Sequence, residues 1–214
     1  MPHLSRRRLL LAVAVVLALL GVGLTVLGLR GHPGPPVAGA DRPVAAASAP
    51  ADDAPTERRP ASTAPPVLLD IPVIGVHSVV NQVGLEPDGT LETPVPGPDY
   101  DEAAWYRGSP VPGRPGPSVI IGHVDSAAAG PSVFYDLGRL RPGDGIIVTA
   151  ADSARREFVV DAVRTVPKND FPQRQVYGAT AHPELRLITC GGDFDPGVGH
   201  YEDNTIVFAH LRQP

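Results

Sequence analysis

Proline and glycine interrupt the second part of this chain too often for long helices to form. The 214 residues include 26 prolines and 23 glycines, and these residues break helical patterns. Short runs rich in β-branched residues lie between them, which favours strands. The runs that we predict as strands are 67–74, 76–83, 118–121, 146–149, 157–166, 185–189 and 205–211. Short helical turns are expected only over 101–106 and 133–137. Seven or eight short strands separated by turns predict an all-β barrel or sandwich.

The N-terminal region carries the features of a membrane anchor. Three arginines within residues 1–8 precede an uncharged apolar run, Leu9–Leu29. A run of about 20 apolar residues is long enough to cross a bilayer as a helix. The positive-inside rule keeps residues 1–8 in the cytoplasm and places the rest of the chain outside the cell. We therefore predict a single-pass membrane protein with an uncleaved anchor over 9–29, and a signal cleaved after Ala40 is the alternative.

Composition divides the remaining chain into a linker and one domain. Residues 30–66 are rich in proline and alanine and almost free of large apolar residues, which predicts a disordered, extended spacer. Residues 67–214 form one domain of ordinary size. The net charge is −5, and the domain has no basic stripe, which argues against a nucleic-acid partner. It also has no phosphate-binding loop and no Cys/His metal spacing, so we expect no cofactor and no metal.

The chain contains one cysteine, Cys190. Exported proteins usually pair their cysteines in disulfides, and this one has no partner within the chain. An apolar run leads to Cys190, and Gly191-Gly192 follows it. This pattern places a thiol at the end of a strand, beside backbone that a substrate can approach closely. We interpret Cys190 as a candidate nucleophile.

A cysteine nucleophile needs a base or a cation nearby. Of the histidines in the domain, His123 has the most informative context, because it follows an apolar run and a glycine at a predicted strand end. The Gly122-His123 step there mirrors the Thr189-Cys190 step of another predicted strand. Spacing does not prove that the two strands are neighbours. Asp125, two residues on, is expected either to orient His123 or to cap the following loop.

Taken together, these residues resemble the sortases, the cysteine transpeptidases of Gram-positive surfaces. The strongest matches are residues 120–125 (Ile-Ile-Gly-His-Val-Asp) and 187–190 (Leu-Ile-Thr-Cys). Weaker matches are residues 134–137, 140–144 and 204–209. Gly191-Gly192 and Trp105-Tyr106 look most like the actinobacterial class F branch. The resemblance covers essentially the whole domain.

The resemblance implies a closed β-barrel of about eight strands. It also implies an activity: family members cleave a Leu-Pro-x-Thr-Gly-like sorting signal between Thr and Gly, through a thioester on the cysteine. An amine, often from a cell-wall precursor, then resolves the thioester to a new amide and anchors the protein at the cell surface. The expected partners are accordingly a sorting-signal peptide, an amine acceptor and the membrane.

One departure concerns the arginine that sortases use on the strand after the cysteine. Asn204 occupies that position, and no arginine lies between Cys190 and Arg212. Asn204 as a neutral donor, Arg186 on the face of Cys190, and Arg107 are the candidates for this role. With Cys190 and His123, we predict Asn204 and Arg186 as the catalytic set. The substrate-binding residues that we expect are Ile188, Thr189, Trp105 and Arg107, and packing is the alternative for Trp105.

Two other functions fit parts of the sequence. An L,D-transpeptidase would also be an exported, β-rich cysteine enzyme, but it carries its His and Cys close together in the sequence. A non-enzymatic wall-binding module on a stalk would need neither Cys190 nor His123.

Overall fold

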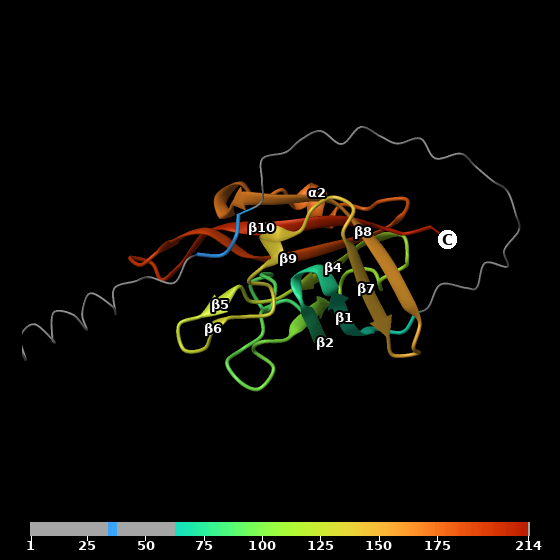
Figure 1. Cartoon of the computed structure of the whole chain (residues 1–214), viewed down its shortest axis with the longest axis horizontal. Helices are drawn as coiled ribbons and strands as arrows, with labels where there is room; N and C mark the ends of the chain where they lie inside the picture. The colour runs from blue at the N-terminus through green and yellow to red at the C-terminus, as the bar shows by residue number, and fades with distance from the viewer. Residues whose placement is uncertain (1–33, 38–62, 214) are drawn as a thin grey trace, which may run out of the picture. The chain divides into compact units, whose positions relative to one another are not determined.

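The second part of the chain folds into a closed β-barrel (Figure 1). The computed structural model describes residues 34–37 and 63–213. The eight barrel strands follow one another in the order β1-β2-β3-β4-β9-β10-β8-β7. Their bounds are Pro66–Ile71 (β1), Val76–Val83 (β2), Ala103–Tyr106 (β3), Gly116–Ile121 (β4), Gly145–Ala150 (β7), Arg155–Pro167 (β8), Pro183–Asp195 (β9) and His200–Leu211 (β10). The small pair β5 (Asp125–Ser126) and β6 (Gly130–Pro131) lies outside the barrel sheet. The predicted all-β closed barrel is confirmed.

Helical structure is short within the described residues. It comprises Pro72–Ile74 (η1), Leu137–Arg139 (η2), Lys168–Asp170 (η3) and Gln173–Tyr177 (α2). The turn predicted at 133–137 lies slightly later, at η2, whereas the helical turn predicted over 101–106 is wrong. Residues Ala103–Tyr106 form β3, between β2 and β4. Ala103 and Ala104 are fully buried there, so pairing inside the sheet overrides the helical preference of alanine.

The barrel wall separates two apolar clusters. One fills the interior, where Leu187 of β9 packs with residues of the other strands, such as Leu69, Ile120 and Phe158. The other lies on the outer face, where Ile188 and Ile206 pack with Val176 of α2. Successive residues of a strand point to opposite faces, so β9 contributes to both clusters. α2 lies beside the long β9–β10 pair in Figure 1 and covers part of the outer face.

Part of the predicted linker contacts the folded domain. Pro35 is buried, and a side chain at Gly138 of η2 would collide with the carbonyl of Pro36. The rest of the linker up to residue 62 and the predicted anchor over 9–29 lie outside the described residues. Among the residues that are described, no helix has the length and apolarity needed to cross a membrane.

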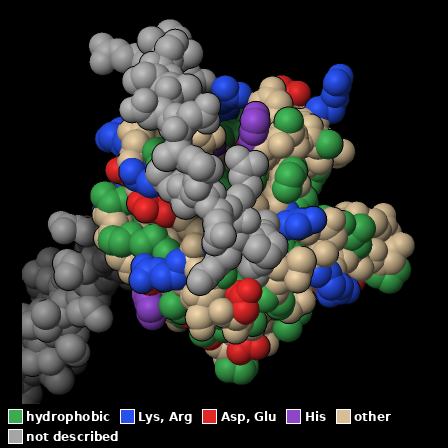
Figure 2. All heavy atoms as spheres, turned by 90° about the vertical axis from the view of Figure 1, so that its right-hand side faces the viewer, with side chains coloured by type: hydrophobic (Ala, Val, Ile, Leu, Met, Phe, Trp, Pro, Cys, Tyr) green, Lys and Arg blue, Asp and Glu red, His purple; other side chains and the backbone are tan. Residues whose placement is uncertain are grey.

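One face of the surface is mixed in character. On the side drawn in Figure 2, the visible hydrophobic side chains form small patches separated by charged and polar ones. Most large apolar side chains of the described domain are instead buried, as in the two clusters above.

Candidate active site

Cys190 lies on β9, directly opposite Asn204 on β10. Directly opposed residues of an antiparallel pair have their Cα atoms about 4.5–5.5 Å apart and their side chains on one face. That face is the outer one, because Ile188 and Ile206, two positions away on the two strands, belong to the outer cluster. Cys190 and Asn204 are both half-buried. No other described residue hydrogen-bonds the Asn204 amide, so its donors are available to a ligand.

The ladder becomes irregular shortly after Cys190, beyond Gly191. Between the pairs Gly191↔Asp203 and Phe194↔Tyr201, β9 has two residues and β10 has one. Gly192 is one of the two and has φ +75°, a conformation that side chains disfavour. Bulges of this kind bend a strand and end regular pairing, often beside active sites. The bulge therefore interrupts the pairing two residues after the cysteine, which explains the glycine at position 192.

His123 reaches the same position from the neighbouring strand. β4 and β9 are parallel, with Ile121 opposite Ile188, and the Gly122 N–H extends the ladder by donating to the Ile188 carbonyl at 3.2 Å. His123 lies two residues after Ile121, and Cys190 lies two residues after Ile188, the last residues that β4 and β9 pair with each other. The predicted His and Cys strands are therefore adjacent, and both residues lie at the same end of them.

The imidazole of His123 is fixed by residues of the β2–β3 connection. The ring of Tyr100 stacks on it, with the centroids 4.1 Å apart and the planes 9° apart. The imidazole Nε2 lies 2.7 Å from the carbonyl oxygen of Pro94. The His123 carbonyl accepts a hydrogen bond of 3.0 Å from the N–H of Phe134, a core residue. The half-buried imidazole is thus held by a stacked ring on its face and by a carbonyl at Nε2, and the backbone of His123 is held by a hydrogen bond.

Asp125 is bound by two tyrosines and has no hydrogen bond to His123 in the structure. Its carboxylate accepts a hydrogen bond from the Tyr201 hydroxyl, and its backbone carbonyl accepts one of 3.1 Å from the Tyr100 hydroxyl. Burial raises the pKa of both phenols, and the charge of Asp125 raises the pKa of each further. Both hydroxyls therefore stay protonated donors at neutral pH.

A hollow of about 460 Å³ lies on the outer face, where β2, β3 and the connection between them line it. It is lined by Asn81, Gln82, Val83, Glu86, Glu92, Ala104 and residues 93–99. Val83 and Ala104 belong to the outer apolar cluster that also contains Ile188, and Pro94 holds His123. A ligand in this hollow would therefore contact both the apolar outer face and the segment that fixes the histidine. The volume is in the range of small-molecule pockets.

The predicted substrate-binding residues lie on different sides of the barrel wall. Ile188 belongs to the outer cluster, beside Cys190 on the same face. Trp105 is 5% exposed and packs in the interior cluster, which is the packing alternative given above. Thr189 is likewise buried and has the opposite facing to Cys190 by strand alternation. Of these three, Ile188 has the position of a residue that contacts a peptide in the outer groove.

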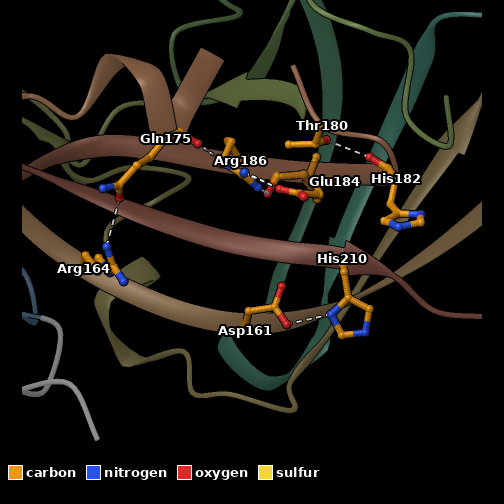
Figure 3. A network of polar contacts seen from close by, with 9 residues as sticks. Asp161, Arg164, Gln175, Thr180, His182, Glu184, Arg186 and His210 are labelled. Carbon is orange, nitrogen blue, oxygen red and sulfur yellow. Dashed lines mark hydrogen bonds and ion pairs between the residues drawn. The ribbon is translucent and has the colours of Figure 1, made fainter. Parts of the chain in front are cut away.

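Arg186 is buried beneath the segment that contains α2. Its guanidinium forms an ion pair with Glu184 and donates a hydrogen bond to the carbonyl of Gln175 (Figure 3). It also donates a hydrogen bond to the carbonyl of Leu185 and lies 4.7 Å from the ring centre of Phe208. It shares the face of Cys190, as predicted, but lies four positions before it along the strand, about 13 Å away. These contacts describe a packing residue. The catalytic role of Arg186 stays a prediction that its surroundings do not favour.

Arg107 lies towards the other end of the strands. It follows β3, in which Trp105 pairs with Ile120 of antiparallel β4. Arg107 is therefore level with Ser118, five residues before His123, or about 16 Å along the strand. Its guanidinium packs over Gly84 and lies 3.7 Å from Glu92, a residue of the hollow. This position is compatible with contact to a long ligand and is far from the thiol.

Pro94, Tyr100 and Tyr201 are the site residues that the sequence analysis missed. Tyr100 and Pro94 belong to a proline-rich stretch that has no hydrophobic period, and Tyr201 follows a Gly-rich turn. No pattern links them to His123, because their contacts depend on how the β2–β3 connection packs. The neighbouring Asp125 was the one available sequence signal.

Comparisons with known proteins agree with this geometry. Residues 69–212 match the family described as the Sortase domain. No curated protein matches the chain.

Solved structures with the same fold come from several sortases. A lid mutant of sortase A from Corynebacterium diphtheriae is 21% identical, with a TM-score of 0.53 over 74% of each chain. Sortase C-1 from Actinomyces oris is 19% identical, with a TM-score of 0.53 over 69% of this chain and 73% of that one. Sortase C1 from Streptococcus agalactiae is 20% identical, with a TM-score of 0.53 over 69% of this chain and 67% of that one. At these identities the likeness concerns the fold.

Proposed function

Because the chain belongs to the sortase family of cysteine transpeptidases, we propose that it cleaves a Leu-Pro-x-Thr-Gly-like sorting signal and transfers the acyl part to an amine. The observation that carries this proposal is the meeting of three residues on the outer face. Cys190 has Asn204 directly opposite on one neighbouring strand and His123 at the end of the other. A thiol, a neutral donor and an imidazole are a sufficient set for acyl transfer through a thioester.

The first half of the reaction forms the thioester. The Cys190 thiolate attacks the threonine carbonyl carbon, and the resulting tetrahedral intermediate collapses as the C–N bond to glycine breaks. The leaving amine takes a proton from the His123 imidazolium, which becomes neutral. General acid catalysis of this kind typically accelerates a reaction by about 10²–10⁴.

The second half reverses these roles with a different amine. The acceptor amine attacks the thioester carbonyl, neutral His123 takes the proton that this amine loses, and the sulfur leaves as a thiolate. The new amide is released, and His123 is again an imidazolium. The cycle needs no metal and no cofactor.

Asn204 is the side chain that we assign to the oxyanion. It lies on the face of Cys190, and its amide hydrogens have no other partner among the described residues. Removing one oxyanion donor typically costs about 10²–10³ in rate. We prefer Asn204 to Arg186 for this role because the Arg186 guanidinium is already bound by Glu184 and two carbonyls.

We further propose that the catalytic domain is extracellular and held at the cell membrane by the apolar run 9–29. The supporting features are the three arginines before that run and the proline-rich stretch after it. On the Gly191-Gly192 and Trp105-Tyr106 motifs, we place the enzyme nearest to the class F branch. Its role is then the anchoring of surface proteins to the cell surface through a cell-wall amine.

The decisive experiment is mass spectrometry of the full chain after mixing with a series of sorting-signal peptides. We expect an adduct on Cys190 with the mass of the peptide up to its threonine, and release of the glycine part. The same assay on His123→Ala tests the histidine. Its matched control is His210→Ala, because His210 is half-exposed and pairs with Asp161. It lies six residues from Asn204 on β10, about 20 Å away. Peptide cleavage that survives Cys190→Ala would reject the proposal, and so would the absence of adduct and cleavage with every peptide.

A further inference from the structure

Two groups around His123 take no part in the bond-making steps above. One is the ring of Tyr100, which lies 4.1 Å from the imidazole and almost parallel to it. The other is the Pro94 carbonyl, 2.7 Å from Nε2. Both belong to the connection between β2 and β3. One short segment therefore contacts the flat face of the imidazole and its edge.

The Pro94 contact determines which nitrogen carries a proton. A carbonyl oxygen only accepts hydrogen bonds, so Nε2 must be the donor and must carry a hydrogen. A neutral imidazole has one N–H, and Nδ1 is then the nitrogen without a proton. Nδ1 is also the nitrogen that remains free to take a proton from one amine and give it to another.

We propose that Pro94 and Tyr100 form a clamp that keeps His123 in the Nε2–H tautomer and leaves Nδ1 to exchange protons with the leaving and entering amines. Both are positioning residues, since they act through His123. This inference rests on the proposed transpeptidase function. The Tyr100 stack contributes by preventing rotation of the ring about its χ angles, which would exchange the positions of the two nitrogens.

The clamp is tied to the hairpin that carries the thiol. The Tyr100 hydroxyl donates to the Asp125 backbone carbonyl, and the Asp125 carboxylate accepts from Tyr201 on β10. The Tyr201 ring in turn packs edge-on against Phe194 of β9, with the centroids 5.3 Å apart. These contacts join the β2–β3 connection, the His123 loop and the β9–β10 hairpin. They therefore hold the imidazole at a fixed place relative to Cys190.

The clamp also borders the hollow in which a peptide would lie. Pro94 and Asp99 line that hollow, and Tyr100 follows Asp99 directly in the sequence. A bound peptide therefore contacts the backbone that orients His123. We expect loss of the clamp to lower kcat more than it raises KM, because a misplaced catalytic group slows the chemical step.

The test is ¹⁵N NMR of the imidazole groups in the full-length chain, with His123 assigned by its absence in His123→Gln. In the wild type we expect the neutral His123 ring to be the Nε2–H tautomer. In Tyr100→Leu, which removes the stack, we expect a mixture of tautomers. Tyr100→Phe keeps the ring and loses the hydroxyl, so the Nε2–H form should persist. An Nδ1–H tautomer in the wild type would overturn the clamp without any variant.

Kinetics with a sorting peptide provide the second readout. We expect Tyr100→Leu to lower kcat by about 10- to 100-fold with KM changed less than about threefold, and Tyr100→Phe to lose less. A Tyr100→Leu chain with the wild-type tautomer and the wild-type kcat would reject the proposal. If the wild type cleaves no such peptide, the proposed function fails, whereas the tautomer measurement still tests the clamp.

Discussion

Cys190 and His123 lie side by side but are held in different ways. Cys190 and Asn204 are part of a hydrogen-bonded ladder, and their mutual position follows from the register of β9 and β10. His123 lies just past the end of β4, and its ring is placed by Tyr100 and Pro94. The sheet therefore fixes the proposed nucleophile and its proposed donor, whereas a connection between strands fixes the proposed acid–base group. Substitutions at the two places should differ in their effects.

The largest effect is expected at the thiol. Cys190→Ala should abolish peptide cleavage and adduct formation, because the chain has no other cysteine. The melting temperature should change little, since Cys190 is half-buried and its strand remains paired. Peptide cleavage and thermal unfolding measure the two quantities. A Cys190→Ala chain that unfolds, beside a Cys190→Ser chain that cleaves normally, would make the residue structural.

The next effect is expected at the imidazole. His123→Ala should slow turnover by about 10²–10⁴, the usual contribution of a general acid–base group. His210→Ala should match the wild type. Steady-state kinetics decide the point. An equal loss in His182→Ala, where the side chain is exposed, with none in His123→Ala, would show that His123 is not the acid–base residue.

A smaller effect is expected at the donor opposite the thiol. Asn204→Ala should lower kcat by about 10²–10³ while the chain stays folded, because Asn204 is half-buried and outside both apolar clusters. Kinetics and thermal unfolding of the same preparation distinguish a loss of catalysis from a loss of folding.

Asn204→Arg completes this test, because it places the usual sortase residue opposite Cys190. Retained or increased activity would mean that the site accepts either donor. A wild-type rate in Asn204→Ala would mean that Asn204 is not the oxyanion donor.

The smallest effect on activity is expected at Arg186. Arg186→Met keeps an apolar stem against Phe208 but removes the ion pair with Glu184. Because Glu184 is still partly exposed, we expect a loss of about 1–3 kcal/mol in the free energy of unfolding. The kcat of the folded variant should stay near that of the wild type. Denaturant unfolding and kinetics check this, and a 100-fold lower kcat without loss of stability would restore Arg186 to the catalytic set.

The difference between positions set by strand pairing and positions set by a connection also explains which features were predictable from the sequence. The apolar runs ending at Gly122-His123 and Thr189-Cys190 indicate strand ends, and a period of two places Arg186 and Cys190 on one face. The resemblance to sortases adds the closed barrel and the position of Asn204. By contrast, Tyr100 contacts His123 through the path of a proline-rich connection, and the burial of Arg186 depends on the segment that packs over it. Such contacts are tertiary, so no local pattern predicts them.

The parallel pairing of β4 with β9 also has a consequence for how the enzyme becomes active. Ile121 pairs with Ile188, 67 positions later (188 minus 121), so His123 and Cys190 meet only after a long stretch of chain has closed. Long-range pairing of this kind forms slowly, and β9 must pair with both β4 and β10 to complete the barrel. During folding, the Cys190 thiol is therefore present before His123 is in place beside it. An incompletely folded chain therefore has the cysteine but no transpeptidase activity. Activity appears only in chains whose barrel sheet has closed completely.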